Sequence, residues 1–141
     1  MQKINFYFHD RKAALKDRKN LKVFIENLFI TEKKALETLS YIFCSDEYLL
    51  EINKVFLKHD FYTDIITFDL SDTKRAIEGE VYISIDRVKE NSKEMGISFT
   101  EELHRVIFHG ALHLCGYNDN KKSEIIKMRN KESFYLLKYF K

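Results

Sequence analysis

Residues 98–119 read SFTEELHRVIFHGALHLCGYND and contain most of the information about the fold. Ser98 is followed three residues later by a glutamate, the spacing of a capping box, so a helix is expected to begin here and to run to Gly116. His109 and His113 are four residues apart within that helix. Both imidazoles therefore lie on one face about one turn apart, where they can reach a single ion.

The rest of the chain alternates between strand and helix patterns. Apolar residues recur with period two or as short β-rich runs in some segments, and with helical spacing in others. This predicts the order β-α-β-α-β-β-α-α-α, an α/β (α+β) fold in which a four-stranded mixed sheet packs with about five helices in a single domain, residues 1–141. The expected strands are 3–9, 36–44, 63–70 and 80–85; the expected helices start near 19 and at a Ser45 or Asp46 cap, and then span 84–95, 98–116 and 121–140.

Composition places few limits on function. The chain has 141 residues, with 24 basic and 22 acidic side chains, so its net charge of +2 does not by itself indicate a nucleic-acid partner. It shows no secretory signal pattern and no apolar run long enough to span a membrane. Its two cysteines form no C-x-x-C pair. We therefore expect a cytoplasmic protein without a membrane partner.

The spacing after the second histidine predicts a metal centre. Gly116 follows His113 by three residues and Asp119 follows it by six, which reproduces the pattern H-E-x-x-H-x-x-G-x-x-H, where the glycine turns the chain so that a third ligand returns to the ion. His109, His113 and Asp119 are thus the predicted metal ligands. Three protein ligands leave a fourth position open, as in catalytic zinc sites, so we expect one Zn²⁺ per chain, although the same set also suits ferrous iron and other divalent transition metals. The alternative is two ordinary histidines, with Asp119 only capping the last helix.

Gly110 occupies the position where a metalloprotease of this pattern has its catalytic glutamate. Because glycine carries no proton, peptidase activity is not expected. A glycine inside a helix costs about 1 kcal/mol relative to alanine, which is tolerable where a second backbone or a ligand must approach closely, or where two elements cross.

At these residues the chain resembles the YbeY family, the bacterial single-strand-specific endoribonucleases of rRNA maturation, whose signature reads H-G-x-L-H-L-x-G-Y-D-H. Residues 109–117 match it without a break. Upstream, residues 63–68 (TDIITF) are similar to the T-D-V-L-S-F strand of the family, residues 79–84 (GEVYIS) to its G-D-I-x-I-S strand, and Ile52-Asn53 to an L-N pair before a loop.

The chain departs from the family at two places. Asp119 stands where the signature has its last histidine, which should make the metal-bound water less acidic than in a three-imidazole site. Leu57 aligns with an arginine usual in the family and cannot contact phosphate. Lys58, His59 or Arg105 would then serve instead, and Arg105 could equally form an ordinary ion pair.

Two further features allow alternative interpretations. Asp64 could orient a ligand imidazole or hold water, or it could simply bond a neighbouring turn. The stretch from Lys121 onward has seven basic residues against two acidic ones. It could follow an RNA backbone or form a solvated helix face.

The resemblance implies a zinc-dependent, single-strand-specific endoribonuclease of rRNA processing and ribosome quality control, with RNA and ribosomal subunits as partners. The expected catalytic set is His109, His113, Arg105 and Lys58, and no general base is assigned. Two other functions are compatible with the site. One is a ribosome-associated RNA-binding module with a structural metal, and the other is a metal-dependent hydrolase of small molecules or peptides.

Overall fold

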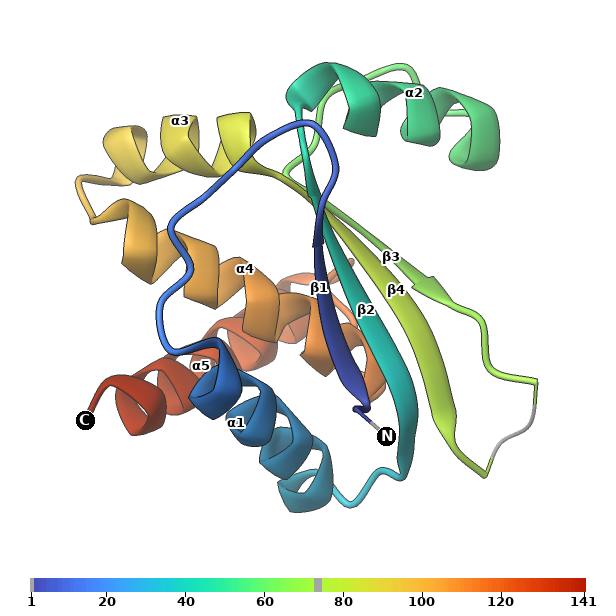
Figure 1. Ribbon diagram of the computed structural model, residues 1–141, viewed down its shortest axis with the longest axis vertical. Coiled ribbons are helices and arrows are strands. Elements are labelled where there is room, and N and C mark those ends of the chain that lie inside the picture. The colour runs from blue at the N-terminus through green and yellow to red at the C-terminus, as the bar shows by residue number, and fades with distance from the viewer. Residues whose placement is uncertain (1, 73–74) are drawn as a thin grey trace.

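A four-stranded mixed sheet forms the centre of the computed structural model, which describes residues 2–72 and 75–141 (Figure 1). The strand order is β1-β2-β4-β3. β1 pairs with β2 and β2 with β4 in parallel, whereas β3 is an edge strand antiparallel to β4. The strands are β1 (Ile4–Phe8), β2 (Leu36–Cys44), β3 (Ile65–Asp69) and β4 (Ile77–Ser84).

Five helices pack against this sheet in the part of the chain that the structure describes. α1, α4 and α5 lie on one side of it, and α2 lies on the opposite side, at the end of the sheet where α3 also begins (Figure 1). Within the described ranges, no helix is both long and apolar enough to cross a membrane. The helices are α1 (Arg18–Thr31), α2 (Asp46–Leu57), α3 (Ile85–Met95), α4 (Phe99–Leu114) and α5 (Lys122–Phe140).

Each face of the sheet has its own apolar cluster, because alternate side chains of a strand point to opposite faces. On β4, Val81 and Ile83 belong to the main core with α1, α4 and α5, whereas Tyr82 packs on the other side beneath α2. The main core includes Phe29, Phe43, Phe108, Leu112, Met128 and Tyr135. α4, the helix that carries His109 and His113, therefore packs on the main-core face of the sheet.

The expected element order and fold class are confirmed, and most element boundaries agree within two residues. Ser45, Ser84 and Ser98 cap α2, α3 and α4, each accepting a hydrogen bond from the backbone N–H three residues later. The largest difference is β4, which begins at Ile77 rather than at residue 80. Residues 77–79 gain strand structure by pairing with β2 and β3, which the local pattern does not reveal.

Candidate metal centre

α4 brings the two histidines to one place beside the sheet. Its start is fixed by Ser98, whose Oγ accepts the backbone N–H of Glu101 at 3.0 Å, and its apolar side chains pack into the core. His109 and His113 face β3 and remain partly accessible, with ring centroids 4.6 Å apart. The helical spacing alone therefore produces the pair that the sequence predicted.

Asp119 reaches the histidines because the chain turns sharply after α4. Gly116 has a φ of +106°, a conformation that favours glycine, and it ends the helical path. The next residue, Tyr117, donates its hydroxyl hydrogen bond to Glu32 at 2.7 Å, which ties the segment to the end of α1. Lys131 on α5 also contacts Glu32, at 3.3 Å. The segment that carries Asp119 is thus anchored on both α1 and α5.

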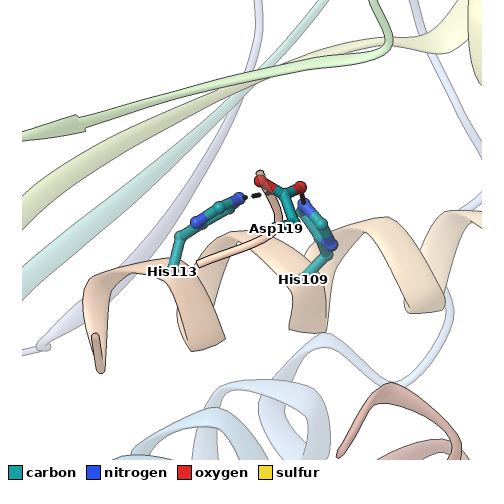
Figure 2. Close-up of side chains that lie close together, drawn as sticks. All are labelled: His109, His113 and Asp119. Carbon is teal, nitrogen blue, oxygen red and sulfur yellow. Dashed lines mark ion pairs between the residues drawn. The ribbon is translucent and has the colours of Figure 1, made fainter. Parts of the chain in front are cut away.

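The three side chains point toward one another (Figure 2). Asp119 Oδ2 lies 3.3 Å from His109 Nε2 and 3.4 Å from His113 Nε2, and one ligand atom from each residue lies within 4.8 Å of the others. Two donors bound to one zinc ion at 2.0–2.2 Å and a tetrahedral angle are about 3.3–3.5 Å apart. The separations of Asp119 from the two histidines therefore match those of ligands that share one ion.

Glu132 of α5 orients the His109 ring. Its carboxylate is 1% exposed and accepts a hydrogen bond from His109 Nδ1 at 2.5 Å. Burial raises the pKa of Glu132, but the His109 hydrogen bond and the charge of Arg105 outweigh that effect and hold it below its usual range. Since a carboxylate only accepts, Nδ1 carries the proton in the neutral ring and Nε2 presents its lone pair. That lone pair faces the Asp119 carboxylate, and a cation between these two acceptors would make both of them ligands.

Arg105 lies one helical turn before His109 and is bound by buried carboxylates. It donates to Glu102 from Nε at 2.6 Å and from Nη2 at 2.7 Å, and to Glu132 from Nη1 at 2.9 Å. The ion pair considered as an alternative for Arg105 is therefore present. The same guanidinium also borders the cavity described next, 4.0 Å from Asp64.

The histidines open into a cavity of about 570 Å³ between α4, β3 and the α2–β3 connection. Among the residues predicted to contact phosphate, Arg105 and His59 line it. Lys58 is exposed, adopts a φ of +60° at the end of α2, and is not among the described lining residues. Leu57 does line the cavity, so an apolar side chain occupies the rim.

Two site residues were not singled out from the sequence. Arg129 lines the cavity and donates to Glu132 at 3.1 Å, yet in the sequence it is one of seven basic residues in a stretch with two acidic ones. Glu132 is one of those two acidic residues. Glu132 lies on the buried face of α5 with Met128 and Tyr135. A carboxylate among buried apolar residues needs a hydrogen-bond partner inside the protein, and this pattern in the sequence could have identified Glu132 as a residue of the site.

Other residues of the motif have structural surroundings. A Cβ at Gly110 would lie only 2.8 Å from Val81 Cγ1, so the group that packs closely against this glycine is a side chain of strand β4. Cys115 is buried away from the ligands, and burial raises its pKa to about 12. Asp64 lines the cavity, but its carboxylate contacts Asn91 at 3.5 Å, and the imidazole-orienting carboxylate is that of Glu132.

Comparison with known proteins identifies relatives along nearly the whole chain. A family model described as "Endoribonuclease YbeY" matches residues 5–140. Proteins of that name from Cytophaga hutchinsonii and Amoebophilus asiaticus are 48% and 43% identical to this chain; the alignments cover 92% and 97% of it, and 90% and 95% of the relatives. A Thermotoga maritima protein solved in solution is 29% identical and matches with a TM-score of 0.60 over 96% of this chain and 89% of its own.

Proposed function

The chain belongs to the YbeY family of endoribonucleases, and on that premise we propose that its single domain, residues 1–141, cleaves single-stranded RNA with one zinc ion held by His109, His113 and Asp119. The observation that carries this proposal is the pair of 3.3 and 3.4 Å separations around Asp119 Oδ2, which match the spacing of zinc ligands. Three ligands also leave room for substrate, as expected of a catalytic site.

The chemistry divides between the ion and the side chains around it. A bound divalent ion would polarise a phosphate oxygen and lower the pKa of a water molecule at the open position. Glu132 holds the His109 ring with Nε2 turned toward Asp119, where the ion would bind, and Arg105 in turn holds Glu132. We therefore propose that Arg105 is a positioning residue whose charge offsets that of the buried carboxylates.

Contact with phosphate falls to other basic side chains. Arg129 lines the cavity, donates to Glu132 and is otherwise exposed, so its guanidinium is placed to meet a phosphate oxygen. Lys58 lies outside the cavity, next to the lining residue His59. Its proposed role is to contact the RNA backbone where the strand leaves the site.

We also propose that the substrate is rRNA, that the protein acts on ribosomal subunits in maturation and quality control, and that this takes place in the cytoplasm. The relatives named endoribonuclease support the reaction. Gly110 supports the choice of RNA over peptides, because no carboxylate stands where a peptidase of this pattern needs one.

One purification combined with two assays tests the proposal. Elemental analysis of protein purified without chelator should find one zinc per chain, since the ligands form a site only in the folded protein. An unstructured RNA should be cut, a chelator should abolish cleavage, and added zinc should restore it. Casein should remain intact.

His109→Ala is the matched variant, and it should lose both metal and cleavage while remaining folded by circular dichroism. Cleavage of casein but not RNA would favour the hydrolase alternative. Metal binding and co-sedimentation with ribosomal subunits without any cleavage would favour the binding module. Absence of stoichiometric metal would overturn the proposed centre itself.

A further inference from the structure

The connection from α2 to β3 places aromatic side chains at the mouth of the cavity. His59 and Phe61 both line it, with ring centroids 5.0 Å apart and an interplanar angle of 21°, and we call them the stacked pair. Phe61 is 55% exposed although it is large and apolar. Its exposed ring also lines the cavity that holds the candidate metal centre, where it is accessible to a ligand.

The turn that carries the stacked pair is held by one buried residue. Asn53 is 2% exposed; its side-chain Nδ2 donates to the Phe61 carbonyl at 2.8 Å, and its main-chain carbonyl accepts the His59 N–H at 3.1 Å. The turn also needs the left-handed conformation of Lys58, with a φ of +60°. These contacts hold the backbone that carries the two rings before any ligand arrives, which reduces the ordering cost of binding.

The charges of the cavity favour a contact with bases. Among the described residues, its lining has three carboxylates, from Asp64, Asp69 and Asp119, and two guanidinium groups, from Arg105 and Arg129. Both guanidinium groups are already paired with buried carboxylates, Arg105 with Glu102 and Glu132, and Arg129 with Glu132. Attraction of phosphate by these side chains is therefore weak, so contacts with the bases would add to the affinity that a bound metal ion supplies.

We infer that the stacked pair, with Phe61 as its main surface, binds one unpaired nucleobase of the RNA by stacking, an inference that rests on the proposed function. A ring can stack only on a base whose face is free, and in a duplex the neighbouring base pairs cover both faces. The stacked pair thus gives a physical basis for single-strand selectivity at this site.

The test compares three variants in binding a short single-stranded RNA with cleavage-resistant phosphorothioate linkages in the presence of zinc. Phe61→Ala should weaken binding by about 5- to 100-fold, the effect of losing one base–aromatic stack. Phe61→Trp should retain binding because it keeps a stacking surface. Phe56→Ala is the matched control, since Phe56 is 67% exposed on neighbouring α2 but is not among the cavity-lining residues, and it should bind like the unmodified protein.

A second readout identifies the base. Replacing each nucleoside in turn by an abasic one should reveal one position where the unmodified protein loses affinity and where Phe61→Ala loses nothing more, as in a double-mutant cycle. 2-Aminopurine at that position should be quenched on binding to the unmodified protein and to Phe61→Trp, but not to Phe61→Ala. Annealing a complementary strand should remove the difference between the proteins.

Binding and cleavage are scored separately, so the two proposals can fail separately. If the unmodified protein cleaves RNA but Phe61→Ala binds it equally well, or Phe56→Ala weakens binding to the same extent, the stacking inference is wrong and the nuclease remains. If RNA binds in a Phe61-dependent way without cleavage, the nuclease proposal is wrong and the stacking inference stands. If no RNA binds, both are overturned.

Discussion

Replacing Glu132 with glutamine should weaken zinc binding even though Glu132 is not a ligand. The carboxylate has three donors around it: His109 Nδ1 at 2.5 Å on Oε2, and Arg105 and Arg129 at 2.9 and 3.1 Å on Oε1. A glutamine amide must turn its NH₂ toward one of these groups. If the NH₂ group faces the arginines, a donor is placed against their donor N–H groups. If the NH₂ group faces His109, Nδ1 must accept its hydrogen bond, so the ring proton moves to Nε2, the atom that should bind the ion.

The size of the effect follows from how completely the carboxylate is enclosed. Glu132 is 1% exposed, so water is poorly placed to replace the lost acceptor. Loss of a supporting partner of a metal-bound histidine costs about 10- to 100-fold in metal affinity, or about 1.4–2.8 kcal/mol. We expect Glu132→Gln to fall in this range, with its zinc dissociation constant measured by competition against a chromogenic chelator.

Glu102→Gln provides the matched control. Glu102 is fully buried and binds the same Arg105 guanidinium through two hydrogen bonds, whereas the carboxylate that accepts from His109 is that of Glu132. Breaking a buried ion pair costs about 3–5 kcal/mol, so both variants should unfold at lower denaturant concentration. Only Glu132→Gln should lose zinc affinity. Equal zinc affinity in Glu132→Gln and the unmodified protein would refute the orienting role.

Three other predictions concern the motif and its surroundings. Asp119→Ala should lose at least 10- to 100-fold in zinc affinity, measured by isothermal titration. Asp119→His should keep the ion and shift the pH profile of RNA cleavage downward, because the bound water becomes more acidic. Unchanged zinc affinity in Asp119→Ala would exclude Asp119 as a ligand. Gly110→Ala should lower the free energy of unfolding by about 1–3 kcal/mol in denaturant titrations, since its Cβ would lie 2.8 Å from Val81 Cγ1, and unchanged stability would show that α4 can shift. Burial raises the pKa of Cys44 and Cys115 to about 12, so at pH 8 about one thiol in 10,000 is ionised; a disulfide reagent should label both only after denaturation, and rapid labelling of the native protein would contradict their burial.

The elements that sequence predicted well are those with local signals. α3 is bounded by a serine cap at Ser84 and a glycine stop at Gly96, and the structure ends it as expected. The β-rich run of β2 likewise coincides with the observed strand, Leu36–Cys44. The sheet order could not be predicted in the same way, because it depends on pairing between segments far apart in the chain, as the longer β4 illustrates.

In the candidate site, too, residues with a local sequence pattern could be predicted, whereas a residue brought in by tertiary packing could not. His109 and His113 follow from helical spacing, and Asp119 from the turn at Gly116, all within eleven consecutive residues. Glu132 lies 23 residues beyond His109 and meets it only because α5 packs on α4. Sequence reasoning could name the three candidate ligands, which the structure brings together, but it could not identify Glu132 as the residue that orients His109, because that contact depends on how α5 packs on α4.

Charge links the metal ligand set to the recognition of RNA. A carboxylate at Asp119 leaves a bound divalent ion with one positive charge less than three imidazoles would leave it. Counted once each, the three lining carboxylates (−3, Asp119 included), the two lining guanidinium groups (+2) and a divalent ion (+2) would leave the loaded site with about one positive charge to attract phosphate. A duplex offers such a site mainly phosphates and sugars, whereas an unpaired strand also offers base faces to Phe61. The carboxylate ligand and the exposed aromatic ring therefore favour the same substrate, because the weaker the attraction for the backbone, the more the affinity depends on a free base.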